Sequence, residues 1–143
     1  NPSGLRHNYI VGGVGVMNIA FSGSRNIGPD MRVLNTAFFD ALRIMRCDVE
    51  DCEVLVGDCP TGADKAVSDR WPLRKEGDRT PVVYIAQWAQ RGNSAGPMRN
   101  QAMINDADVL VAFPCPKSKG TWDAIRKAVK KGIPVVIIPL GVE

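Results

Sequence analysis

The sequence predicts an α/β fold in which helices cover both faces of a mostly parallel sheet. Apolar runs of strand length alternate along the chain with segments of helical periodicity. The apolar runs are nearly continuous, which is typical of strands buried on both faces. A length of 143 residues and a hydrophobic share of 45% match one globular domain with one core. Together these features predict a three-layer Rossmann-like fold with five strands or slightly more.

The predicted elements follow one another in strict alternation. Apolar runs that end in turn residues mark the strands, and apolar residues at three- and four-residue spacing mark the helices. Strands are predicted at 18–22, 53–57, 81–86, 108–113 and 135–138, and helices at 30–45, 63–71, 97–106 and 121–131. Parallel strands joined by right-handed helical crossovers satisfy this order.

Four residues mark helix ends in this scheme. Asp30 precedes the first helix and belongs to a residue type that caps helices. Pro97 is predicted to be the first residue of the third helix, a position where proline is tolerated. Thr121 is expected to cap the last helix and Gly132 to end it.

The chain is interpreted as a single domain over residues 17–143. Residues 1–16 contain several glycines, show no apolar periodicity and precede Met17, so they are interpreted as a leader or a remnant of expression. The net charge of +3 is too small to indicate a nucleic-acid or membrane surface. The basic cluster at 126–131 is interpreted as the solvated end of a helix, where cations complement the helix dipole.

Cysteine usage and hydropathy indicate a reduced, cytoplasmic protein. The four cysteines lack metal-ligand spacing, and His7, the one histidine, lies far from them in the sequence. No metal site and no cofactor are therefore expected. Every apolar run is shorter than a bilayer requires, so no membrane partner is expected either.

Four loops are the candidate ligand site. In an open parallel sheet, the loops that follow the strands converge on one edge, where ligands bind. These loops are rich in glycine, hydroxyl and amide residues, and most of them open into a helix whose free N–H groups attract anions. They cover residues 23–25, 58–64, 87–100 and 114–121. A phosphate group is the ligand feature that this composition favours.

The loop at 57–64 (G-D-C-P-T-G-A-D) has the two-glycine frame of a P-loop. Ala63 and Asp64 stand where a P-loop has the lysine for the terminal phosphates and the hydroxyl for magnesium. Nucleoside triphosphate hydrolysis is therefore disfavoured, and a simple tight turn is the competing interpretation. Gly13-Val14-Gly15 is a weaker signal, because it precedes the first strand and lacks the third glycine of a dinucleotide fingerprint.

Three further positions carry alternatives. Arg99, beside Asn100, is a candidate clamp for phosphate or carboxylate, against a surface pair with Asp106 or another carboxylate. The segment Ser118-Lys119-Gly120-Thr121 is a candidate phosphate cradle, against simple helix capping. Trp88 is a candidate stacking surface for a base, against a place in the core.

The loops also offer groups for acid–base chemistry, without a nucleophile–histidine pair. The candidate acids are Asp30, Asp58, Asp64 and Asp123. The candidate electrophilic groups are Arg25, Arg99 and Lys119.

An ordered series of motifs resembles a known family. The motifs are G-S-R (23–25), Asp30, G-D-C-P-T-G-A-D (57–64), Trp88, A-G-P-M-R-N (95–100), A-D-V-L-V-A-F (107–113) and S-K-G-T (118–121). The chain resembles the SLOG superfamily from Met17 to its C-terminus, in the YspA-like branch of small stand-alone proteins of bacteria and phages. Distant relatives are the lysine-decarboxylase-like "lonely guy" phosphoribohydrolases and DNA-processing protein A.

The resemblance implies a Rossmann-like fold, a nucleotide or nucleotide-derived ligand such as an ADP-ribose-type molecule, and a homodimer or higher oligomer. Carried over by position, it places these residues near the ligand: Gly23, Ser24, Arg25, Thr61, Gly62, Asp64, Arg99, Asn100, Gly120 and Thr121. Trp88 and Ser118, from the loop analysis, complete the expected ligand-binding set.

The chain departs from the catalytic relatives at one position. Their motif P-G-G-x-G-T-x-x-E carries a glutamate that serves N-glycosidic bond cleavage, and Ala124 stands there in this sequence. Asp123 precedes it and is expected to point about 100° away around the helix. The leading hypothesis is therefore a protein that binds or senses a nucleotide derivative. An N-glycosyl hydrolase that uses Asp64, Asp58 or Asp123 is the alternative, and a DNA-processing single-strand-binding protein is the second alternative, disfavoured by charge.

Overall fold

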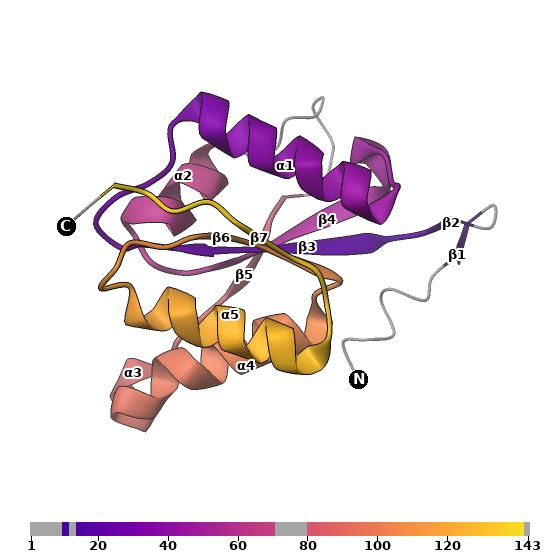
Figure 1. Cartoon of the computed structure of the whole chain (residues 1–143). Helices are drawn as coiled ribbons and strands as arrows, with labels where there is room; N and C mark the ends of the chain where they lie inside the picture. Colours follow the sequence, from indigo (N-terminus) through magenta and orange to yellow (C-terminus); the bar gives the residue numbers. More distant parts are fainter. Residues whose placement is uncertain (1–9, 12–13, 71–79, 142–143) are drawn as a thin grey trace.

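The computed structural model of the chain describes residues 10–11, 14–70 and 80–141. Five strands form one fully parallel sheet in the order β5-β4-β3-β6-β7 (Figure 1). Their bounds are β3 (Met17–Gly23), β4 (Cys52–Gly57), β5 (Val82–Tyr84), β6 (Val109–Phe113) and β7 (Val135–Ile137). The sheet predicted from the apolar runs is confirmed, and its strands begin and end within two residues of the predicted limits.

Helices cover both faces of this sheet, which confirms the predicted three-layer fold. The bounds are α1 (Met31–Met45), α2 (Gly62–Arg70), α3 (Trp88–Arg91), α4 (Ala95–Asp106) and α5 (Lys119–Lys131). Figure 1 shows α1 and α2 on one side of the sheet, and α3, α4 and α5 on the other. Two short 3-10 turns, η2 (Val49–Asp51) and η3 (Gly92–Ser94), complete the order. Trp71, at which the second predicted helix ends, lies outside the described residues.

Alternate residues of each central strand pack into two separate cores. In β6, Val109, Val111 and Phe113 face α1 and α2, whereas Leu110 and Ala112 face α4 and α5. All five are fully buried. Their burial on both faces accounts for the nearly continuous apolar runs in the sequence.

Helix ends agree with the sequence at α1 and differ at α4 and α5. Asp30 caps α1 by accepting a hydrogen bond from the backbone N–H of Val33 at 2.8 Å, and Gly132 ends α5 in the left-handed conformation. Pro97 is the third residue of α4 rather than the first, and Thr121 is the third residue of α5 rather than its cap. The N–H groups of a first helical turn have no helical partner, so proline is tolerated throughout that turn.

A two-stranded antiparallel pair, β1 (Ile10–Val11) and β2 (Val14–Gly15), precedes β3. It lies within the segment interpreted as a leader, where the sequence predicts no element.

The order of the strands in the five-stranded sheet indicates where a ligand site is expected. The chain passes from β3 to β4 on one side, and β6 pairs with β3 on the other, so the strand order reverses between β3 and β6. Ligands of open parallel sheets bind beyond the carboxyl ends of strands at this reversal.

Candidate functional site

A cavity of about 530 Å³ opens beyond the carboxyl ends of β3, β4 and β6. This volume falls in the range of about 300 to 1,000 Å³ that is typical of small-molecule sites. All four predicted loops contribute to its lining. The predicted residues that line it are Gly23, Ser24, Arg25, Asp64, Trp88, Arg99, Asn100, Ser118, Lys119, Gly120, Thr121 and Asp123. Asp30, Asp58, Thr61 and Gly62 do not line it.

The wall formed by the loop after β3 is organised by Ser24. Its hydroxyl oxygen accepts hydrogen bonds from the backbone N–H groups of Asn26 and Ile27, at 3.1 and 3.2 Å. Its carbonyl oxygen accepts a bond from the N–H of Ala63 at 2.9 Å. The side chain of Thr61 donates to the carbonyl oxygen of Arg25 at 2.7 Å. Ser24 and Thr61 therefore fasten this loop to the start of α2.

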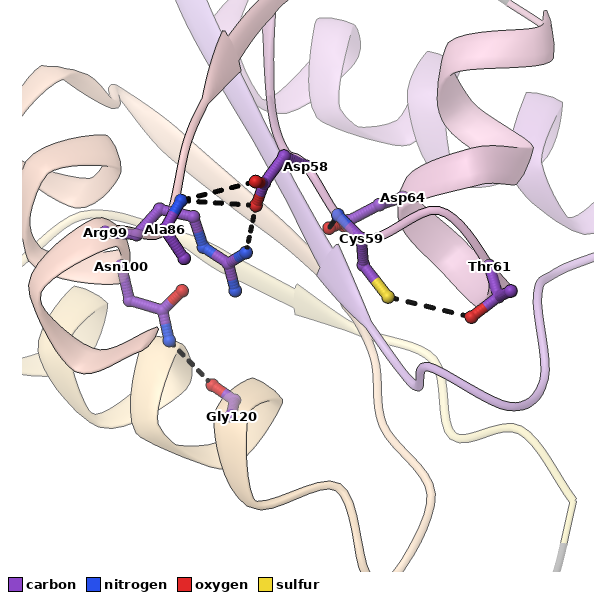
Figure 2. A network of polar contacts seen from close by, with 8 residues as sticks. All are labelled: Asp58, Cys59, Thr61, Asp64, Ala86, Arg99, Asn100 and Gly120. Carbon is purple, nitrogen blue, oxygen red and sulfur yellow. Dashed lines mark hydrogen bonds and ion pairs between the residues drawn. The ribbon is translucent and has the colours of Figure 1, made fainter. Parts of the chain in front are cut away.

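Gly57, the last residue of β4, makes room for two charged side chains. A Cβ atom at this position would lie 2.7 Å from Oδ2 of Asp64 and 3.1 Å from Cζ of Arg99. Asp64 is 8% exposed and accepts a hydrogen bond from the N–H of Cys59 at 3.1 Å (Figure 2). Burial raises the pKa of the Asp64 carboxyl above its ordinary value, against the opposing effects of the Cys59 bond and the Arg99 charge. A carboxyl group whose pKa is raised in this way keeps its proton to a higher pH than an ordinary aspartate does.

Arg99 is paired, but with a carboxylate that the sequence analysis did not select as its partner. It donates to Oδ1 of Asp58 at 2.8 Å, and Asp58 also accepts from the N–H of Ala86 (Figure 2). The expected alternative, Asp106, is the last residue of α4 and instead accepts a hydrogen bond from Tyr84. The Nε atom of Arg99 is buried without a hydrogen-bond partner among the described residues. One hydrogen bond thus fixes the position of Arg99, and the remaining N–H donors of its guanidinium group lie in the cavity lining.

Trp88, the first residue of α3, stands at the mouth of the cavity and not in the core. Its side chain lines the cavity while the residue is 46% exposed. The guanidinium carbon of Arg25 lies 5.4 Å from the centre of the indole ring, which is a cation–π contact. Gly96 leaves space for the ring, since a Cβ atom there would lie 3.2 Å from it. The interpretation of Trp88 as a core residue is therefore wrong.

The start of α5 forms the opposite wall. The hydroxyl oxygen of Ser118 accepts a hydrogen bond from the N–H of Cys115 at 2.9 Å and makes no capping bond to α5. Thr121 is 3% exposed and lines the cavity, and its hydroxyl has no hydrogen-bond partner within the part of the chain that is described. A Cβ atom at Gly120 would meet no described atom within 4 Å outside its own helix turn. The first turn of α5 therefore faces the cavity with free backbone donors and open space.

Asn100 joins α4 to this turn. Its amide nitrogen donates to the carbonyl oxygen of Gly120 at 3.0 Å (Figure 2) and to Oδ2 of Asp123 at 3.1 Å. Oδ1 of Asp123 accepts from Lys127 at 2.6 Å. Ala124 is fully buried in the core and does not line the cavity. The carboxylate on this wall is therefore Asp123, one residue before the position where the catalytic motif of the family that the sequence resembles has its glutamate.

Positive charge dominates the lining. Five basic residues and two acidic residues line the cavity: Arg25, Arg99, Lys117, Lys119 and Arg126 against Asp64 and Asp123. Such a lining attracts an anion. In the basic cluster at 126–131, Arg126, Lys130 and Lys131 are exposed, as the interpretation as a solvated face expects, but three members of the cluster also take part in the site or in packing. Arg126 lines the cavity, Lys127 binds Asp123, and Lys131 donates to three carbonyl oxygens at the end of α4.

Some residues that line the cavity were not predicted from the sequence as site residues, among them Asn26, Cys59, Asn93, Lys117 and Arg126. Cys59, Asn93 and Lys117 lie inside predicted loops, and this position could have identified them as candidates. Arg126 had a signal in its spacing, since it follows Asp123 by three residues and so shares a helix face with it.

The described residues contain neither a membrane-spanning helix nor a cluster of metal-ligating side chains. None of the described helices has the length and apolar character needed to cross a membrane. Within the described ranges, His, Cys, Asp and Glu side chains nowhere gather in a group of three that could hold a metal ion.

Comparison with known proteins gives one informative similarity. The chain is similar to the Gene 61 protein of Mycobacterium phage D29, with 44% identity over 79 residues that cover 52% of this chain and 62% of that protein. The matched region thus spans less than two thirds of the phage protein's length. A phage relative agrees with the expected occurrence in bacteria or phages. No protein-family model matches the chain, and no solved structure matches it.

Proposed function

We propose that the protein binds a nucleotide or nucleotide-derived ligand in the cavity, with a phosphate group at the start of α5. The observation that carries this proposal is the open first turn of α5, where Gly120 leaves space and Thr121 presents a buried hydroxyl without a partner among the described residues. A helix N-terminus with free N–H groups binds anions well. The excess of basic side chains in the lining supports the same ligand charge.

The second end of the ligand is an aromatic base. Trp88 offers a half-exposed ring at the cavity mouth, and Arg25 already stacks on it. Base–aromatic stacking contributes about 1 to 3 kcal/mol. The four free cysteines support function in a reducing compartment such as the cytoplasm.

Calorimetric titration tests the proposal. The panel contains the four nucleoside 5′-monophosphates, ADP-ribose and cyclic nucleotides. We expect binding of at least one member and a tenfold or greater weakening in Thr121→Val, which removes the hydroxyl and keeps the shape. Thr36→Val, at an exposed position of α1 away from the cavity, is the matched control. Absence of heat with every member of the panel would refute the proposal.

A second candidate function is N-glycosidic bond hydrolysis, favoured by the buried Asp64. A carboxyl group with a raised pKa is able to protonate a departing base, while Asp123 on the opposite wall is placed to activate water. Asp58 is unsuited to either role, because it is bound to Arg99 and does not line the cavity. Chromatography of nucleotide incubated with the protein tests this function. Release of free base that Asp64→Asn abolishes is the expected result, and intact nucleotide with binding preserved would exclude it.

A further inference from the structure

The wall beside the start of α5 carries hydrogen-bond acceptors in a lining whose charged side chains are mostly basic. Asn100 is 3% exposed, and its amide nitrogen is bound to Gly120 and Asp123. Both of these partners are acceptors, so the NH₂ group must face them. The Oδ1 atom of Asn100 therefore has no hydrogen-bond partner among the described residues. Asn100 lines the cavity, so this acceptor is available to a ligand.

Asp123 extends the same acceptor surface. Each of its carboxylate oxygens accepts one hydrogen bond, from Asn100 or from Lys127. An ionised carboxylate has about four acceptor sites, so acceptor capacity remains on both oxygens. Asn100 and Asp123 together form what we call the acceptor pair. It lies against Gly120, within one helical turn of the proposed phosphate position.

An acceptor pair in that place does not suit a phosphate, because acceptor faces acceptor and the charges repel. It suits hydroxyl groups, which donate. A sugar attached to a phosphate brings its hydroxyls within a few bonds of the anion. We propose that the acceptor pair binds ribose hydroxyls of the ligand and makes the site selective for ribonucleotides over deoxyribonucleotides. This inference rests on the proposed function and adds the sugar to it.

The ion pair of Asp123 differs from a purely structural helix pair in the same chain. Lys65 and Asp69 in α2 are also four residues apart, but their side chains are 57% and 63% exposed and lie outside the cavity lining. The side chains of Asp123 and Lys127 are 22% and 20% exposed. The ion pair of Asp123 and Lys127 is therefore largely buried in the wall of the cavity, and the hydrogen bond from Lys127 orients the carboxylate.

Calorimetry with AMP and GMP against their 2′-deoxy and 3′-deoxy analogues tests the inference. The wild-type protein is expected to bind AMP or GMP roughly ten- to hundredfold more tightly than at least one deoxy analogue, because an unmatched charged acceptor is left behind. In Asp123→Ala this ratio falls toward one, mainly through weaker binding of the ribonucleotide. Asp69→Ala, which removes the exposed helix pair, keeps the wild-type ratio.

The outcomes separate this inference from the proposed function. Equal binding of ribo and deoxy forms by the wild-type protein would overturn the inference and leave the proposed function standing. An unchanged ratio in folded Asp123→Ala would overturn it as well. If neither AMP nor GMP binds, the inference is overturned, and the proposed function fails only if no other member of its panel binds either. The wild-type comparison needs no variant, so a folding defect in Asp123→Ala leaves the test intact.

Discussion

The two walls of the cavity use glycine for opposite reasons. Gly62 lies behind the wall formed by the loop after β3; it has a φ of +67°, and a Cβ atom there would lie far inside contact distance of the Ser24 carbonyl oxygen. A Cβ atom at Gly57 would likewise press on Asp64 and Arg99. Gly120 has helical backbone, and a Cβ atom there would meet nothing described within 4 Å outside its own helix turn. The first wall needs its glycines for its own packing, whereas the α5 wall leaves space that the protein itself does not fill.

This difference identifies which motif glycines serve folding and which serve a ligand. On the first wall, loop-to-loop hydrogen bonds through Ser24 and Thr61 already use the polar atoms. On the α5 wall, the free N–H groups and the Thr121 hydroxyl face the cavity. Substitutions on the first wall should therefore change stability most, and those on the α5 wall should change binding most.

Gly62→Ala should have the largest effect on stability. The substitution combines an unfavourable positive φ with a backbone clash, and we expect a loss of at least about 3 kcal/mol in the free energy of unfolding. Urea denaturation measures it. Gly132→Ala is the matched control, because Gly132 also has a positive φ of 88° but open surroundings. That control should lose only about 1 kcal/mol, and equal losses would mean that the loop contact is unimportant.

Arg99→Ala should weaken both binding and stability. Loss of the guanidinium group from the cavity removes a charge-assisted hydrogen-bond donor, which costs roughly 1.5 to 3 kcal/mol in the free energy of ligand binding. Because Asp58 loses its ion-pair partner, we also expect the free energy of unfolding to fall by about 1 to 2 kcal/mol. Arg43→Ala removes the exposed pair with Asp40 and should change stability by less than about 0.5 kcal/mol. Identical stability losses in the two variants would contradict the role of the Asp58 pair.

Asp64→Asn should change how stability depends on pH. The raised pKa means that the folded state binds a proton more tightly than the unfolded state. The stability that the bound proton contributes is fully present below the ordinary aspartate pKa of about 3.9. It is lost as the pH rises through the pKa of Asp64 in the folded protein. Asp64→Asn should therefore gain stability relative to wild type across that window, by about 1.4 kcal/mol for each pKa unit of the rise. Urea denaturation from pH 4 to 8 measures the difference, which stays constant if Asp64 has an ordinary pKa.

Gly120→Ala should have the smallest effect on stability and a clear effect on binding. Alanine favours helix over glycine, so the free energy of unfolding should rise by roughly 0.5 kcal/mol or stay unchanged. The added methyl group enters the space assigned to phosphate and should weaken nucleotide binding at least tenfold. Denaturation and calorimetry on the same preparation give both values. Unchanged affinity would place the phosphate elsewhere.

The fold could be predicted from sequence because each central strand is buried on both faces and the two longest helices, α1 and α5, each have a clear apolar face. The strand at 109–113 and the helix capped by Asp30 are examples. The helix α3 was missed, since four residues show no periodicity. Its first residue, Trp88, owes its position to Arg25, which is distant in sequence, and to the space beside Gly96.

The candidate site could be predicted as a set of loops but not as a set of contacts. A general rule for parallel sheets brings the four loops to one edge. The pairing of Arg99 with Asp58 across 41 positions depends on how α4 lies over β4, which no local pattern encodes. The acceptor pair depends in the same way on the packing of α4 against α5.

Amide NMR spectra recorded during titration with AMP test the central claim most directly. If a phosphate binds at the open turn of α5, the backbone signals of residues 118–121 shift most, followed by those of 23–25 and 99–100, while β1 and β2 stay unchanged. Saturable shifts confined to any other surface, or no shifts at millimolar AMP, would contradict the account.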